Sequence, residues 1–211
     1  MILLLLLLFA QKPPSVSLVA PVDPVIAAKT HDQIAANLTP SAKSKVASAV
    51  ASIRTTSNIT DTAAKTAVSS AFPGLGDSDI QALTFIVMME ASNGAQQDLQ
   101  NIMSEVDKMN SQKAALRSRL TAMGKAAAPP RIAKVIVQSH PAEYYRAPDP
   151  LPENASATDI EKRINDLDAM SDSNKLRVQK LKNQQQQMLA VVSNTFKAAQ
   201  SIAPNVIRNL K

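Results

Sequence analysis

The chain has 211 residues, of which 3% are aromatic, four are glycine and none is cysteine. So few aromatic residues and glycines exclude a broad mixed core and argue against sheet-rich, barrel and dinucleotide-binding folds, whose tight turns need glycine. The lack of cysteine excludes disulfides, thiol nucleophiles and cysteine metal sites. Abundant Ala, Ser, Gln, Lys, Leu and Met favour long helices. We therefore expect an elongated all-α protein that is not an enzyme.

The formal net charge is +6, and the basic residues gather in two segments without acids. Residues 108–134 contain seven Lys and Arg, and residues 175–211 contain seven more, with no Asp or Glu in either segment. Basic runs can indicate a nucleic acid or an anionic membrane as partner. Because no nucleic-acid motif accompanies them and few aromatic residues are present for base stacking, we interpret them as solvated helix faces or as partners of acidic segments. Nucleic acid is not an expected partner.

Residues 1–24 combine an apolar leader with a Pro-rich stretch. The run MILLLLLLFA at 1–10 is too short to span a bilayer as a helix and resembles the apolar core of a signal peptide. A cleaved export peptide, an uncleaved anchor or packing segment, and a wrongly assigned start all stay open. The prolines that follow, up to Pro24, predict extended chain. We expect an exported protein, located at the cell surface or outside the cell.

Residues 25–76 are rich in Ala, Ser and Thr and predict short helices. Thr39 is the expected N-cap of one helix, with Pro40 at its first position. Thr60 is the expected N-cap of another helix, which reaches Ala71. Both helices have small, weakly apolar faces, so we expect them to become ordered against a partner surface.

The first long helix is expected over residues 77–124. Ser78 and Gln81 have the spacing of a capping box, and Gly124 is the expected C-terminal stop. The stretch LTFIVMM at 83–89 is apolar on all sides, which predicts burial all round. Beyond it, apolar residues recur at alternating steps of three and four, with Lys113 as a cationic interruption. The seam residues on this helix are Leu99, Ile102, Val106, Met109, Leu116 and Leu120.

A Pro-rich linker is expected over 125–157, in which 131–138 could form one short strand that pairs across a subunit contact. The second long helix is expected over 158–211, with Thr158 and Glu161 as its capping box. Pro204 should kink or end it. Its apolar positions also alternate by four and three. The seam residues on this helix are Ile164, Leu167, Val178, Leu181, Met188, Val192, Ile202 and Val206.

Four positions of the second seam are polar: Ser171, Asn174, Gln185 and Thr195. Buried polar seam residues cost stability but can fix register or partner number. The simpler interpretation is that these layers face water. The sequence leaves both interpretations open.

Each long helix would be roughly 68 Å long at 1.5 Å per residue. Helices of equal length with a connection of this size predict an antiparallel hairpin. Because two helices alone bury little surface, we expect their seams to pack against the N-terminal helices or against other copies of the chain.

No motif for catalysis or cofactor binding is present. His31 and His140 have no second ligand at metal spacing, so we expect both on the surface. Asp166 and Asp168 lie two apart on a helix and do not face each other. We therefore expect no cofactor, no metal and no small-molecule substrate. Glycosylation sequons begin at Asn37, Asn58 and Asn154, and they matter only in a glycosylating secretory pathway.

The C-terminal residues SNTFK at 193–197, then Ile202 and VIRNLK at 206–211, resemble the ending of type III secretion needle subunits. Residues 82–99, with FIVMME followed by QQDL, are similar in kind to the first coiled-coil helix of EspA-type filament proteins. This resemblance implies a secreted subunit whose helical hairpins pack into a hollow filament, with the C-terminal helix lining the lumen.

The leading hypothesis from the sequence is a structural subunit, many copies of which assemble into an extracellular filament or tube, with other secretion or surface proteins as further partners. The alternative is a periplasmic or surface coiled-coil adaptor that binds one partner helix. The two differ in that the adaptor forms no fibres.

Overall fold

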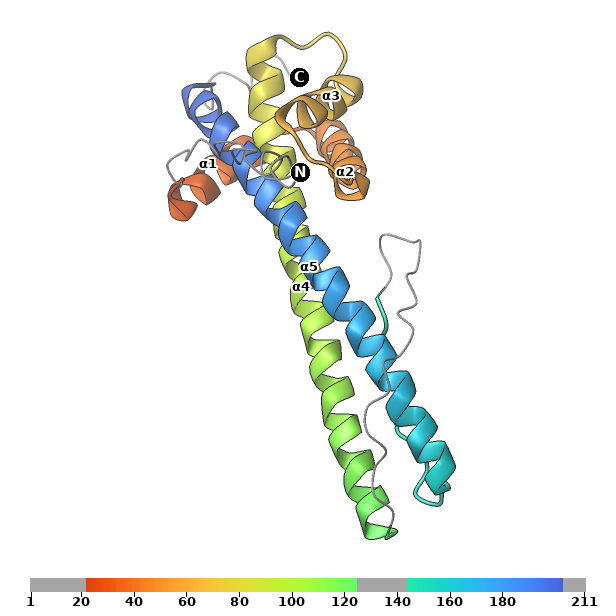
Figure 1. Cartoon of the computed structure of the whole chain (residues 1–211). Helices are drawn as coiled ribbons and strands as arrows, with labels where there is room; N and C mark the ends of the chain where they lie inside the picture. Colours follow the sequence, from red (N-terminus) through yellow and green to blue (C-terminus); the bar gives the residue numbers. More distant parts are fainter. Residues whose placement is uncertain (1–21, 125–143, 203–211) are drawn as a thin grey trace, which may run out of the picture.

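The computed structural model describes residues 22–124 and 144–202, and within these ranges it contains five helices and no strand (Figure 1). The helices, in chain order, are α1 (Pro24–Ala36), α2 (Pro40–Thr55), α3 (Asp61–Ala71), α4 (Asp77–Ala122) and α5 (Ala157–Ile202). The predicted all-α fold with a long antiparallel hairpin is confirmed. The strand predicted at 131–138, His140 and the chain beyond Ile202 lie outside the described residues.

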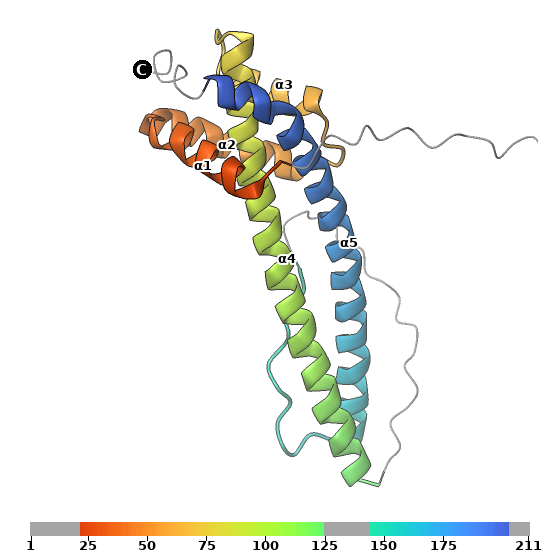
Figure 2. The same cartoon turned by 90° about the vertical axis from the view of Figure 1, so that its left-hand side faces the viewer.

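The molecule consists of a rod and a head. Helices α4 and α5 are 46 residues each, about 69 Å at 1.5 Å per residue, and they lie side by side along the rod (Figures 1 and 2). The head consists of the three short helices α1–α3 together with the start of α4 and the end of α5, against which they pack. The other end of the rod, where α4 ends and α5 begins, is the tip.

The centre of the head is the first part of α4. All seven residues at 82–88 have no exposed surface, because α1, α2, α3 and α5 all contact this helix. Phe85 packs against Phe196 of α5 with 5.7 Å between ring centroids. The all-round burial expected from the apolar stretch is confirmed, except that Met89 is half-buried.

Polar contacts fasten the short helices to the hairpin. The Gln184 side chain donates to Thr56 O at 2.9 Å, and Ile59 N donates to Gln187 Oε1 at 2.9 Å, so α5 holds the loop between α2 and α3. Arg54 of α2 pairs with Asp98 of α4. Its guanidinium lies over Gly94, where an added Cβ would stand 3.2 Å from Arg54 Nη1.

Two predicted caps are confirmed and two are wrong. Thr39 and Thr60 each accept a hydrogen bond from the amide three residues on, at 3.2 Å. Helix α4 instead begins at Asp77 after Gly76, without a side-chain cap, so the Ser78–Gln81 box does not form. At its other end, Gly124 adopts a φ of 72°, the left-handed conformation of a helix stop.

The capping box of α5 lies two residues earlier than predicted. Ser156 Oγ accepts from Asp159 N at 3.2 Å, and Asp159 Oδ2 accepts from Ser156 N at 3.3 Å. The predicted pair Thr158 and Glu161 is already inside the helix, which begins at Ala157. Spacing alone could not choose between the two pairs, because both fit the pattern.

Helix α1 begins at Pro24, where the prolines of the N-terminal segment predict extended chain. Proline is accepted in the first turn of a helix, where its missing N–H costs nothing. Asp23 caps this helix by accepting from Val25 N at 2.9 Å. His31 is expected on the surface, and its side chain is partly covered there: it is 17% exposed and faces Glu90 of α4, with 3.7 Å between Nε2 and Oε1.

Candidate functional site

The most distinctive site is an extended segment, residues 144–156, that lies along the half of the hairpin nearer the tip (Figure 2). We call this segment the strap. It contains no helix or strand, and the fixed φ of Pro148, Pro150 and Pro152 favours an extended backbone. The last residue of the strap, Ser156, is the N-cap of α5.

Asn174 of α5 holds the first part of the strap. Its Oδ1 accepts from Tyr145 N at 3.0 Å, and its Nδ2 donates to Tyr145 O at 2.8 Å. Asn174 is only 1% exposed. A buried amide must find partners, and here both come from the main chain of the strap.

A stripe of polar residues on α4 holds the rest. Ala147 N donates to Glu105 Oε2 at 2.8 Å. Gln112 Nε2 donates to Pro148 O at 2.7 Å, and Arg119 Nη2 donates to Pro152 O and Glu153 O at 3.0 and 2.8 Å. Glu105, Gln112 and Arg119 are seven residues apart, so they share one face of α4. The stripe therefore runs along α4 in the same direction as the strap, and its successive residues bind successive parts of the strap.

Helix α5 supplies one more contact, from Arg163 Nη1 to Asp149 O at 3.1 Å. We call the five side chains that bind the main chain of strap residues 145–153 the strap groove; they are Glu105, Gln112 and Arg119 of α4 and Arg163 and Asn174 of α5.

The Glu105 carboxylate is held ionised by its surroundings. It accepts from Lys108 Nζ at 2.7 Å in addition to the Ala147 amide. The Lys108 hydrogen bond, followed by the Ala147 amide, lowers the pKa of Glu105 below its ordinary value. The strap is thus attached to a charged acceptor, which strengthens the hydrogen bond.

Apolar contacts of the strap are modest. Tyr145, Ala147, Leu151 and Ala155 pack against the core of the rod near the tip. However, every residue of the strap is half-buried or exposed, and none is buried. The strap is therefore held largely by hydrogen bonds to its main chain.

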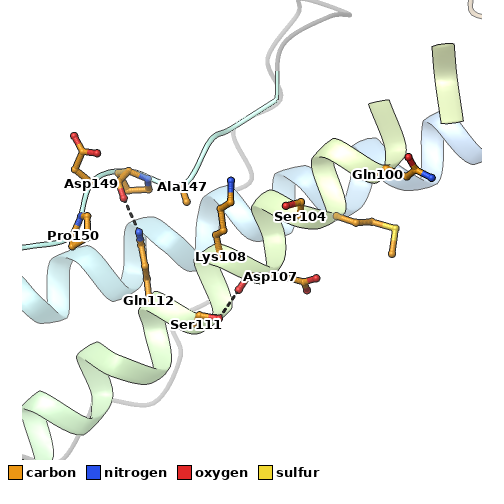
Figure 3. Close-up of a pocket in the computed structure, with 11 residues that line it drawn as sticks. Gln100, Ser104, Asp107, Lys108, Ser111, Gln112, Ala147, Asp149 and Pro150 are labelled. Atoms are coloured by element: carbon orange, nitrogen blue, oxygen red, sulfur yellow. Dashed lines mark hydrogen bonds between the residues drawn. The ribbon is translucent and has the colours of Figure 1, made fainter. Parts of the chain in front are cut away.

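An open hollow of about 800 Å³ lies between α4 and the strap (Figure 3). It is lined by α4 residues within 100–112 and by strap residues 147–150. Figure 3 shows Gln112 reaching from α4 toward the strap, where its Nε2 donates to Pro148 O. Most of the α4 residues are polar, and the apolar Met103 is 53% exposed.

The structure brings most of the predicted seam residues together inside one chain. Val106, Val178 and Leu181 are half-buried, α5 ends at Ile202, and Val206 lies outside the described residues. The buried seam residues are Leu99, Ile102, Met109, Leu116, Leu120, Ile164, Leu167, Met188 and Val192. Whether copies of the chain also associate through the seam stays a prediction.

The polar seam positions are largely buried. Ser171, Asn174 and Thr195 are buried, and only Gln185 is half-buried. The interpretation that these layers face water is therefore wrong for three of the four. The buried Thr195 hydroxyl needs a hydrogen-bond partner, and it donates to Val191 O of its own helix at 2.9 Å.

The cationic interruption at Lys113 has a partner across the seam. Lys113 Nζ lies 2.8 Å from Asp168 Oδ1, with the two side chains 10% and 16% exposed. Arg117 Nη2 is 3.9 Å from the other oxygen of Asp168. A charge in the seam is tolerated here because the facing helix supplies the opposite charge.

The hydroxyl residue of each glycosylation sequon has a structural role as a helix cap. The hydroxyl residues Thr39, Thr60 and Ser156, which complete the three sequons, are the N-caps of α2, α3 and α5. A cap needs a hydroxyl or a short polar side chain at these positions. The sequons therefore do not by themselves indicate glycosylation.

Sequence reasoning missed the strap groove, although two signals were present. The polar residues at 105, 112 and 119 repeat every seven positions beside the apolar seam, and Asn174 stood out as a polar seam residue. These side chains bind main-chain atoms of the strap. Because every residue has the same main-chain groups, such binding leaves no pattern in the sequence.

Comparison with protein-family models, with curated proteins and with solved structures finds no match. The resemblance to type III secretion filaments thus stays a prediction. Within residues 22–124 and 144–202 no group of three or more His, Asp or Glu is placed to hold a metal ion. None of the helices in these two ranges is both long and apolar enough to cross a bilayer.

Proposed function

We propose that this protein is a structural adaptor: a self-contained helical rod with a helical head that binds another protein. The observation that supports this proposal is the closed seam. Residues at both ends of it, such as Leu120 near the tip and Val192 near the head, are buried within a single chain. A rod that covers its own apolar seam has no general need of further copies.

The same observation weakens the main argument for a filament. That hypothesis required apolar ridges that one chain could not cover. Few large apolar side chains stay exposed on the described rod and head, and they come from α1, α4 with its C-cap, and α5; a few exposed apolar residues are normal on a monomer surface. They are Val25, Ile26, Met103, Met123, Leu176 and Leu189.

Location outside the cytoplasm stays part of the proposal and is supported only by the apolar run at 1–10. Analysis of the N-terminus of the protein recovered from its native source would show whether that run is removed.

Size-exclusion chromatography with light scattering, followed by negative-stain microscopy, tests the proposal. We expect one particle mass over a wide range of protein concentration, and short rods without fibres. A mass that rises with concentration, together with fibres or tubes in the images, would instead support the filament hypothesis.

A further inference from the structure

We infer that the strap groove is a binding surface for an extended, proline-containing segment of a partner protein, and that the strap is its intramolecular occupant. This inference rests on the proposed adaptor function and names the class of partner. The partner displaces the strap from the groove, while α4 and α5 stay paired along their seam.

The first argument is that the groove recognises main chain. Every hydrogen bond described above between the five groove residues and the strap ends on a main-chain N–H or C=O of the strap. Recognition of this kind depends on the backbone conformation of the bound segment and tolerates changes in its side chains. A second segment with the same backbone can make the same bonds.

The second argument is the arrangement of donors and acceptors. The strap amides of Tyr145 and Ala147 donate to the oxygens of Asn174 and Glu105. Farther along, Gln112 and Arg119 donate to the carbonyl oxygens of Pro148 and Pro152. The second half of the groove therefore offers only donors, which suits prolines because they have carbonyls but no N–H.

Proline also lowers the entropy lost on binding, because a proline-rich segment is already extended when free. In addition, two of the donors at this end are arginines: Arg119 binds the carbonyl of Glu153 and Arg163 binds the carbonyl of Asp149, so both bind acidic residues of the strap. The partner segment is thus expected to have prolines at alternate positions with acidic residues among them.

The third argument is that the strap can leave at low cost. None of its residues is buried, and segments with few buried apolar contacts open locally at low free energy. The open hollow beside strap residues 147–150 gives an incoming segment access to the groove. A departed strap leaves the buried Asn174 amide without its two partners, which favours replacement by another main chain.

The test uses a fluorescent peptide with the sequence of residues 144–156 and a full-length chain whose residues 144–155 are replaced by Gly and Ser. We expect the peptide to bind the strap-replaced chain. It should bind the unmodified chain about tenfold more weakly, because the resident strap occupies the site for most of the time. A peptide with its three prolines changed to alanine should bind the strap-replaced chain more weakly than the parent peptide.

Asn174→Ala in the strap-replaced chain should weaken binding about fivefold, the effect of losing about one hydrogen bond's net free energy. Asn183→Ala is the matched control, since Asn183 is exposed on the same helix, and it should leave binding unchanged. The inference is overturned if the folded strap-replaced chain does not bind the peptide. Equal binding by the unmodified chain, or an Asn174→Ala variant with full affinity, would overturn it as well.

A second measurement does not depend on the folding of the strap-replaced chain. Hydrogen exchange of the unmodified chain, followed by mass spectrometry, reports on the amides of Tyr145 and Ala147. We expect excess peptide to speed their exchange, because the peptide takes their place in the groove. If exchange stays unchanged in excess peptide, the strap is not displaceable and the inference fails. Neither experiment depends on the particle mass, so the adaptor proposal stands or fails separately.

Discussion

A single charged residue, Lys113, interrupts the first seam, and Asp168 of α5 faces it at 2.8 Å. We expect Lys113→Met to lower the free energy of unfolding by about 2–4 kcal/mol, since it leaves the carboxylate of Asp168 in the seam with only Arg117 nearby. The double variant Lys113→Met with Asp168→Leu should regain most of that loss, because it also removes the unpaired charge. Urea unfolding followed by circular dichroism measures both variants.

Lys175→Met is the matched control for this experiment. Lys175 pairs with Asp172 on the surface of α5, with both side chains more than half exposed. Exposed pairs contribute little, so the change should stay within about 0.5 kcal/mol. An equal loss in Lys113→Met and Lys175→Met would contradict the assignment of Lys113 to the buried seam.

Glu105 makes part of the stability depend on pH. Its pKa in the folded chain is lower than the ordinary 4.5, first because of Lys108 and then because of the Ala147 amide. A carboxyl with a depressed folded pKa adds stability above its unfolded pKa, and this stability is lost as pH falls through the folded pKa. We expect Glu105→Gln to unfold with a shallower dependence on pH than the unmodified chain, between about pH 5 and pH 3.

Urea unfolding at a series of pH values checks this expectation. The two chains should differ most at the upper end of the range and converge at the lower end. Parallel pH profiles for the two chains would show that the Glu105 carboxylate does not contribute to stability through its charge.

At the scale of elements, the sequence predicted the helices better than their ends. The apolar pattern fixed α4 and α5, because a period of three and four residues over many turns has no other explanation. Thr39 and Thr60 were also correct, since each stands alone as a cap before a helical run. The start of α1 was missed because Pro24 is compatible both with extended chain and with a first helical turn.

The start of α5 provides the sharpest test of a helix end. Ser156→Ala removes the hydroxyl that caps the Asp159 amide, and we expect it to cost about 1 kcal/mol of stability. Thr158→Ala should change stability by less than about 0.5 kcal/mol, because Thr158 is exposed inside the first turn. Thermal unfolding of the two variants compares them directly. A larger loss in Thr158→Ala would favour the box predicted from the sequence.

At the scale of the whole molecule, the hairpin could be predicted from the sequence, but the position of the strap in its groove could not. Helix pairing follows from residues on the two helices themselves, so a periodic pattern reveals it. The strap depends on long-range contacts between side chains such as Asn174 and main-chain atoms of Tyr145. No local pattern encodes that pairing, and the prolines of the segment indicated only a linker.

The seam decides whether the rod is one chain or part of a larger assembly. Leu167 is fully buried in the seam, whereas Leu189 on the same helix is 47% exposed. We expect Leu167→Asp to lower the free energy of unfolding by about 4 kcal/mol, because it places a charge in the core. Leu189→Asp should cost less than about 1 kcal/mol, mostly through helix propensity.

Thermal melting at several protein concentrations, with light scattering of each variant, tests this. If the seam is internal, the melting temperature of the unmodified chain does not change with concentration, and Leu167→Asp weakens the folded monomer itself. A Leu167→Asp chain that keeps its helices and its melting temperature, but no longer associates, would show that the seam joins separate copies.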